Sequence, residues 1–210
     1  MSFWTMIRNA FSLMSRGEWR ELNFRLRVRL GQIDLKTSGP GDPDYSEERG
    51  YHYADSGGLH LEKILKTLNI TSEDSIVDFG SGKGGVLFTF SKFPFAKITG
   101  CEVYPELAEI AKRNLKVMGV KNVSIVVADA ADFKDLDGYN FFYFFNPFPA
   151  DVMAAVVKNI VSSLSKKPRK VRLIYFNPEC HDVIVKDTPF TKVGEYPQNG
   201  LKYHVYSNAI

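Results

Sequence analysis

Five polar residues each follow a short apolar run, and their side chains are of the types that bind a small polar ligand. They are Asp78, Glu102, Asp129, Asn146 and Asn177. The first is followed at once by a glycine-rich stretch, Gly80-Ser-Gly-Lys-Gly-Gly85. Glycines let a backbone turn sharply and approach a ligand closely because they lack a Cβ atom. Carboxylates and amides beside such a turn can accept hydrogen bonds from the hydroxyl and amino groups of a nucleoside.

Apolar periodicity predicts the elements that position these residues. Strands are expected at 76–79, 97–103, 123–128, 139–145 and 171–176, and helices at 59–69, from 86 to just before Pro94, at 105–118 and at 150–164. An Asn199-Gly200 turn predicts a hairpin over 190–207. Alternating strands and helices indicate an α/β fold, a doubly wound, mostly parallel seven-stranded sheet with an antiparallel C-terminal hairpin. Ligands of such sheets bind beyond the carboxyl ends of the strands, so the polar residues should share one site.

The N-terminal part of the chain differs in composition from the rest. Residues 1–36 carry seven basic and three acidic side chains, whereas the remainder is nearly neutral. We expect a helix at 2–16, either a strand or a helix at 22–30, and a linker at 37–50. The predicted division is therefore a helical, basic extension with its linker at 1–50 and one α/β domain at 51–210. Residues 2–36 are expected to make a peripheral contact or a contact between subunits.

Several classes of protein are disfavoured. The two cysteines make neither a disulfide framework nor a metal-ligand spacing, so no metal site is predicted. No apolar run approaches the ~20 residues that a membrane helix needs, and no signal peptide is recognisable, which predicts a cytoplasmic protein. The mild net charge of +3 does not by itself indicate nucleic acid. His52, His181 and His204 are isolated, and none is assigned as a base.

The glycine stretch fits two cofactor patterns. Gly80-x-Gly82-x-x-Gly85 matches the dinucleotide fingerprint, with Glu102 22 residues after Gly80, and this keeps an NAD(P)-dependent oxidoreductase as an alternative. The second pattern is Asp78-x-Gly80-x-Gly82-x-Gly84. A helix before the first strand favours the second pattern, as does an acid that suits a cationic amino group better than a pyrophosphate.

Four stretches carry a family resemblance: Val77-Asp-Phe-Gly-Ser-Gly-Lys-Gly-Gly85, Gly100-Cys-Glu-Val-Tyr104, Ala128-Asp-Ala-Ala131 and Phe144-Phe-Asn-Pro-Phe-Pro149. With them, the chain from Tyr51 onward resembles the class I, Rossmann-like S-adenosylmethionine-dependent methyltransferases. The resemblance implies S-adenosylmethionine as the cofactor and S-adenosylhomocysteine as its product. Gly80 and Gly82 would cradle the methionine part, and Glu102 would bind the ribose hydroxyls. The implied cofactor-binding residues are Asp78, Gly80, Ser81, Gly82, Gly84, Glu102, Val103, Asp129, Ala130 and Asn146.

Asn146-Pro147 also resembles the Asn/Asp-Pro-Pro-aromatic motif of enzymes that methylate amines, although Phe148 and Pro149 stand in inverted order. The resemblance implies that Asn146 and Pro147 are catalytic, because their oxygens would accept the N–H bonds of an amine. Tyr51, Tyr53 and Phe148 are the expected substrate-binding residues. Methyl transfer from a sulfonium depends mainly on positioning. A small molecule or a protein amine is favoured over RNA as acceptor, since no RNA-binding sheet signature is present. A non-catalytic protein that binds S-adenosylmethionine is a further alternative.

Overall fold

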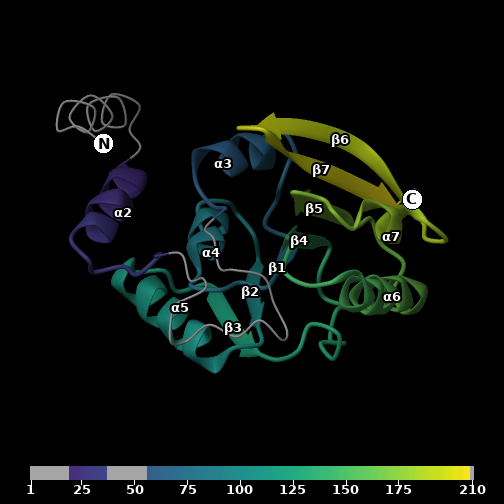
Figure 1. Ribbon diagram of the computed structural model, residues 1–210, viewed down its shortest axis with the longest axis horizontal. Coiled ribbons are helices and arrows are strands. Elements are labelled where there is room, and N and C mark those ends of the chain that lie inside the picture. The colour runs from purple at the N-terminus through teal and green to yellow at the C-terminus, as the bar shows by residue number, and fades with distance from the viewer. Residues whose placement is uncertain (1–18, 37–55, 209–210) are drawn as a thin grey trace.

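A computed structural model describes residues 19–36 and 56–208. These residues form one seven-stranded sheet of β1 (Ser75–Phe79), β2 (Lys97–Glu102), β3 (Val123–Val127), β4 (Phe141–Phe145), β5 (Arg172–Phe176), β6 (Phe190–Gln198) and β7 (Leu201–Asn208), in the order β3-β2-β1-β4-β5-β7-β6 (Figure 1). The first five strands run parallel, and β7 is antiparallel to both β5 and β6. The predicted sheet and its C-terminal hairpin are thus confirmed.

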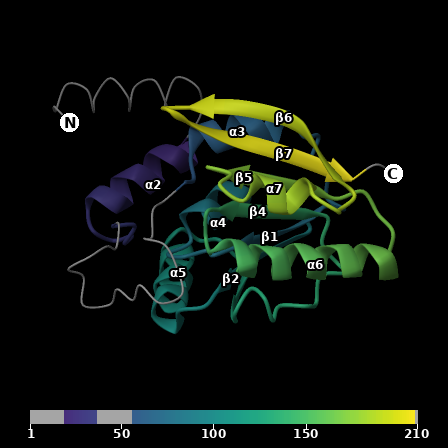
Figure 2. The ribbon, with the colours of Figure 1, turned by 45° about the vertical axis from the view of Figure 1, so that its right-hand side comes forward.

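Helices cover both faces of this sheet, as expected for a doubly wound fold (Figures 1 and 2). Side chains of α3 (Leu59–Lys66), α4 (Gly85–Phe90) and α5 (Pro105–Val117) pack on one face. Those of α6 (Ala150–Lys166) and α7 (His181–Val185) pack on the other. Successive strand residues point to opposite faces, so Ile76 joins the first core and Val77 the second. The short helix α7 was not predicted, because five residues are too few to show a helical period.

The central strand β4 has the sequence Phe-Phe-Tyr-Phe-Phe, and its first four residues are buried. Such a strand suits a parallel sheet that is covered on both faces. Strand β1 pairs with β2 on one side and with β4 on the other. The direction of winding therefore reverses between β1 and β4, and the carboxyl ends of these strands are where a ligand is expected to bind.

Residues 22–30, left open between strand and helix, fall largely in the helix α2 (Trp19–Arg29). The Phe24 ring of this helix stacks on Phe88 of α4 with centroids 4.4 Å apart. The chain beyond α2 also packs on the domain, because Ile33 is only 2% exposed. The described part of the N-terminal extension is therefore attached to the sheet domain.

Some predicted features lie outside the described residues. They are the helix at 2–16, the linker at 37–50 and the candidate substrate residues Tyr51 and Tyr53. Within the described ranges, every helix is too short or too polar to cross a membrane.

Candidate functional site at the carboxyl edge of the sheet

The strand order gathers the predicted polar residues at one edge of the sheet. Following the sheet from β3 to β5, its carboxyl ends lead in turn to Asp129, Glu102, Asp78, Asn146 and Asn177. Parallel strands bring all five to the same edge, although up to 99 positions separate them in the chain. The first three are acids on neighbouring strands, and the last two are amides on the next two strands. The site therefore has an acidic half and an amide half.

The glycine turn lies between these halves, after β1. Gly80, Gly82 and Gly84 have φ angles of 78°, 49° and 84°, a region that side-chain-bearing residues rarely adopt. The amides of Gly80 and Ser81 both donate to the carbonyl oxygen of Cys101, at 2.9 and 3.1 Å. A Cβ atom added to Gly80 would lie 2.5 Å from Cβ of Pro147. The glycine turn and the turn after β4 are consequently in close contact, and no larger residue fits between them.

Glu102, at the end of β2, is tied directly to the glycine turn. Its Oε2 accepts a hydrogen bond from the Gly82 amide at 2.7 Å, and its Oε1 accepts one from the Tyr104 amide at 3.0 Å. The side chain is buried, and burial raises the pKa of this carboxyl, while hydrogen bonds from the amides of Tyr104, Gly82 and Val103 oppose that rise. Each carboxylate oxygen has two lone pairs, so Glu102 can also accept a hydrogen bond from a ligand.

The three acids act electrostatically on a common neighbour. Burial raises the pKa of the Cys101 thiol to about 12, and the charges of Glu102, Asp129 and Asp78 add to this rise. Asp78 is 3% exposed, and Asp129 accepts a hydrogen bond from the Ala131 amide at 2.9 Å. The thiol is therefore protonated at neutral pH, chiefly because it is buried, and the three nearby acids add to this effect.

The two Asn-Pro turns of the site differ in their contacts. Asn146 and Asn177 both have positive φ angles, of 41° and 51°. The side-chain amide of Asn177 donates to the carboxylate of Glu179, only two residues away, as in a local turn. The Asn146 side chain is buried, and its Oδ1 accepts a hydrogen bond from the Tyr175 hydroxyl at 2.7 Å. That hydroxyl in turn accepts one from the Cys180 amide at 3.3 Å. Asn146 thus has a fixed amide orientation that a strand-ending turn does not require.

Tyr175 was missed by sequence reasoning, because it lies inside an apolar strand and nothing near it in the sequence marks a polar role. Three other residues that the sequence predicts for the site are partly or fully buried. Val103 is half-buried, Ala130 is buried, and Phe148 is buried in the core with its ring 6.4 Å from that of Phe144. The Ser81 hydroxyl is buried and finds no hydrogen-bond partner among the residues that the structure describes.

Known proteins resemble this chain over its central part. Residues 76–167 match a family model described as a methyltransferase domain. An rRNA adenine N-6-methyltransferase of Limosilactobacillus reuteri is 28% identical over 102 residues, which make up 49% of this chain and 40% of that protein. A protein-L-isoaspartate O-methyltransferase of Protochlamydia amoebophila is 34% identical over 68 residues, which make up 32% of each chain. This chain therefore matches less than half the length of each of these two curated relatives.

A solved structure shares the fold. The RNA methyltransferase from Salinibacter ruber, in complex with S-adenosyl-L-homocysteine, superimposes with a TM-score of 0.56. The likeness covers 70% of this chain and 89% of that chain at 13% sequence identity. At this level of identity, the likeness concerns the fold alone.

Proposed function

We propose that this chain is a class I, S-adenosylmethionine-dependent methyltransferase and that it transfers the methyl group of S-adenosylmethionine to an acceptor bound beside Asn146 and Pro147. The match of residues 76–167 to a methyltransferase domain and the shared fold support this proposal. The observation that carries this proposal is the contact between Gly80 and Pro147, 2.5 Å for a Cβ built on the glycine. This contact supports a site in which the turn that binds the cofactor lies against the turn that binds the acceptor, at the point where the strand order reverses.

The residues present fit the cofactor. S-adenosylmethionine, when bound, supplies an electrophilic methyl group on a positively charged sulfur. The acids Asp78, Glu102 and Asp129 create a negative potential that suits this charge and the cofactor's amino group. Glu102 has hydrogen-bonding capacity for a ribose diol. We assign Gly80, Gly82 and Gly84 to the methionine part and Asp129, with Ala130, to the adenine.

Asn146 is the proposed positioning group for the acceptor. The Tyr175 hydroxyl already accepts a hydrogen bond from Cys180, so its own proton is available to Asn146 Oδ1. The amide is thereby held in one orientation, and Oδ1 keeps a second lone pair for an N–H bond of the acceptor. This arrangement supports an amine as acceptor, aimed by Asn146 and the Pro147 carbonyl. Positioning of the acceptor in this way can supply a large part of the rate enhancement of methyl transfer.

The acceptor molecule itself is proposed only by class. The names of the two curated relatives point to different acceptors, an adenine nitrogen of rRNA in one and an oxygen of protein L-isoaspartate in the other. We propose a small molecule or a protein amine. Turnover with labelled S-adenosylmethionine, measured on fractions of small amines, proteins and RNA, distinguishes these classes, and transfer to RNA alone would contradict the proposed class.

The function is tested by two measurements on the same set of variants. Calorimetric titration with S-adenosylhomocysteine should show binding to the wild-type protein, and the absence of binding would contradict the cofactor assignment.

The Asn146→Gly variant removes the side-chain amide of Asn146, and glycine tolerates the positive φ angle at this position. We expect this variant to lose about 100-fold or more in kcat, the scale of losing a positioning group, while its affinity for S-adenosylhomocysteine changes far less. Asn69→Gly, at another asparagine with a positive φ angle (50°) that is exposed and lies after α3, away from the site, is the matched control and should retain both properties. Full turnover by Asn146→Gly would refute the positioning role, and binding without turnover on any fraction would indicate a non-catalytic protein.

A further inference from the structure

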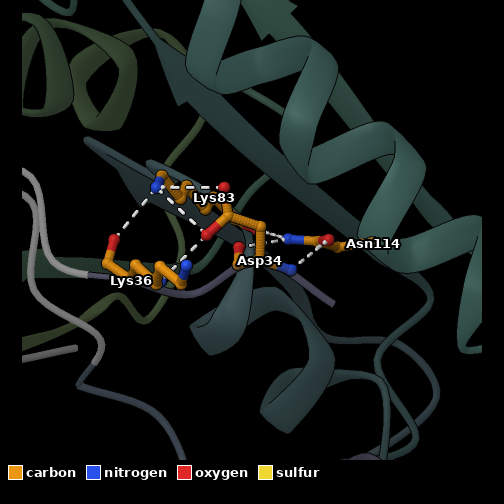
Figure 3. A network of polar contacts seen from close by, with 4 residues as sticks. All are labelled: Asp34, Lys36, Lys83 and Asn114. Atoms are coloured by element: carbon orange, nitrogen blue, oxygen red, sulfur yellow. Dashed lines mark hydrogen bonds and ion pairs between the residues drawn. The ribbon is translucent and has the colours of Figure 1, made fainter. Parts of the chain in front are cut away.

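The side chain of Lys83 leaves the glycine turn and contacts Asp34 and Lys36 of the N-terminal segment (Figure 3). Lys83 lies between Gly82 and Gly84, and its side chain is 7% exposed. Its Nζ is 3.3 Å from both carboxylate oxygens of Asp34 and donates to the carbonyl oxygen of Lys36 at 2.9 Å. A buried ammonium thus takes its carboxylate partner from a segment 49 positions earlier in the chain.

The side chain of Asn114 on α5 binds the backbones of both Asp34 and Lys83. Its Oδ1 accepts from the Asp34 amide at 3.0 Å, and its Nδ2 donates to the Asp34 carbonyl at 2.8 Å. Nδ2 also donates to the Lys83 carbonyl at 3.0 Å. Asn114 is 4% exposed, so these bonds are shielded from water. The side chain of one helix residue therefore fastens the N-terminal segment to the cofactor turn.

The turn has contacts on this side with a second residue of α5. A Cβ atom on Gly84 would lie 3.2 Å from Cβ of Ala111. The buried Ile33 adds apolar contact next to Asp34. A turn with three glycines at positive φ has many alternative conformations in the absence of outside contacts. The segment 33–36 and α5 supply such contacts from the side of Lys83.

We propose that Asp34 is a positioning residue for cofactor binding, acting through Lys83 on the glycine turn. This inference rests on the proposed cofactor role of that turn. Removing the Asp34 carboxylate breaks the ion pair that joins the N-terminal segment to the buried Lys83 ammonium, and this weakens the hold of that segment on the glycine turn. Ligand affinity falls in proportion to the fraction of molecules whose site is in the binding conformation. Removal of the Asp34 carboxylate should therefore weaken cofactor binding.

The test compares the isosteric variant Asp34→Asn with the charge-preserving variant Asp34→Glu by titration with S-adenosylhomocysteine well below their melting temperatures. Asp34→Asn should raise the dissociation constant about tenfold, and Asp34→Glu should recover most of the affinity. The control is Glu62→Gln, which breaks the ion pair between Glu62 and Lys92 at 2.6 Å, whose two side chains are mostly buried. That pair ties α3 to the chain just after α4, so its loss should lower the melting temperature with little change in affinity.

Amide hydrogen exchange provides a second readout that does not need ligand. Exchange at residues 80–84 should be faster in Asp34→Asn than in the wild type and unchanged in Glu62→Gln. Wild-type affinity in Asp34→Asn, or an equal loss in Glu62→Gln, would overturn the positioning role. If the wild-type protein itself does not bind S-adenosylhomocysteine, the proposed function fails, and this outcome is distinct from a failure at Asp34.

Discussion

Glu102 combines a buried carboxyl with two short hydrogen bonds from the backbone. The hydrogen bonds favour the charged form, whereas burial favours the protonated form and prevails, so the pKa of Glu102 is raised. A carboxyl in this state has an immediate consequence for a ligand that donates hydroxyl groups. Only the ionised form offers all of its lone pairs as acceptors.

We therefore predict that affinity for S-adenosylhomocysteine falls as the pH falls through the raised pKa of Glu102, at a pH above the range of an ordinary glutamate. Below this pKa the free protein carries a protonated Glu102, and the charge-assisted bonds to the ribose are lost. Glu102→Gln should bind about 10- to 100-fold more weakly at neutral pH, from the strength of charged hydrogen bonds, and its affinity should depend less on pH. Titrations at stepped pH check this, with Glu106→Gln on the exposed start of α5 as control. An equal pH dependence in Glu102→Gln would contradict the assignment.

At the scale of elements, the β6–β7 hairpin and α7 are joined by a cluster of aromatic and charged side chains. The Tyr206 hydroxyl lies 2.8 Å from Nδ1 of His181 and 2.9 Å from Nδ1 of His204. Nε2 of His204 is 2.9 Å from the Glu195 carboxylate. Burial lowers the pKa of His204, Lys192 and Lys202 lower it further, and Glu195 opposes them. These histidines therefore have a structural role in holding α7 against the sheet.

This cluster predicts a stability that depends on pH. An imidazole with a lowered pKa in the folded protein takes up its proton more readily in the unfolded chain, so stability decreases as the pH falls through the ordinary histidine pKa and down to the lowered one. Scanning calorimetry across this interval should show a falling melting temperature for the wild type. His204→Gln should show a shallower fall, because the titrating group is gone. Parallel curves for the two proteins would rule out this role for His204.

At the scale of the whole molecule, the two ends of the parallel strands have different tasks. The carboxyl edge carries the candidate site, whereas the amino edge is closed by polar side chains. Arg169, just before β5, donates to the carbonyl oxygens of Tyr139 at 2.6 Å and Leu136 at 2.8 Å, ahead of β4. It also donates to the Lys167 carbonyl and the Ser163 hydroxyl at the end of α6. Arg169 thus joins three segments on the side opposite the site.

Arg169→Met should consequently destabilise the protein without affecting the site. Several carbonyl oxygens lose their donor, and we expect a loss of about 2–4 kcal/mol in the free energy of unfolding. Urea denaturation measures this loss, and the exposed Arg113→Met on α5 serves as control. The affinity for S-adenosylhomocysteine should stay at the wild-type value. A substantial loss of affinity in Arg169→Met would show that the two edges are coupled.

The sequence by itself determined the class of fold, the glycine turn and the polar residues at the strand ends. These features are local: period-two and helical apolar patterns mark the elements, and each polar residue directly follows its own strand. For residues 22–30 the local pattern fitted both a strand and a helix, and the structure forms a helix there, with Phe24 stacked on Phe88 of α4.

Only the tertiary structure decided which of these residues touch. The strand order brings Pro147 against Gly80, and the packing of β4 beside β5 brings Tyr175 to Asn146. The ion pair of Asp34 with Lys83 joins residues 49 positions apart. No local pattern encodes such contacts, because they form only when elements distant in the chain bury their apolar faces together and so fix where each polar side chain lies.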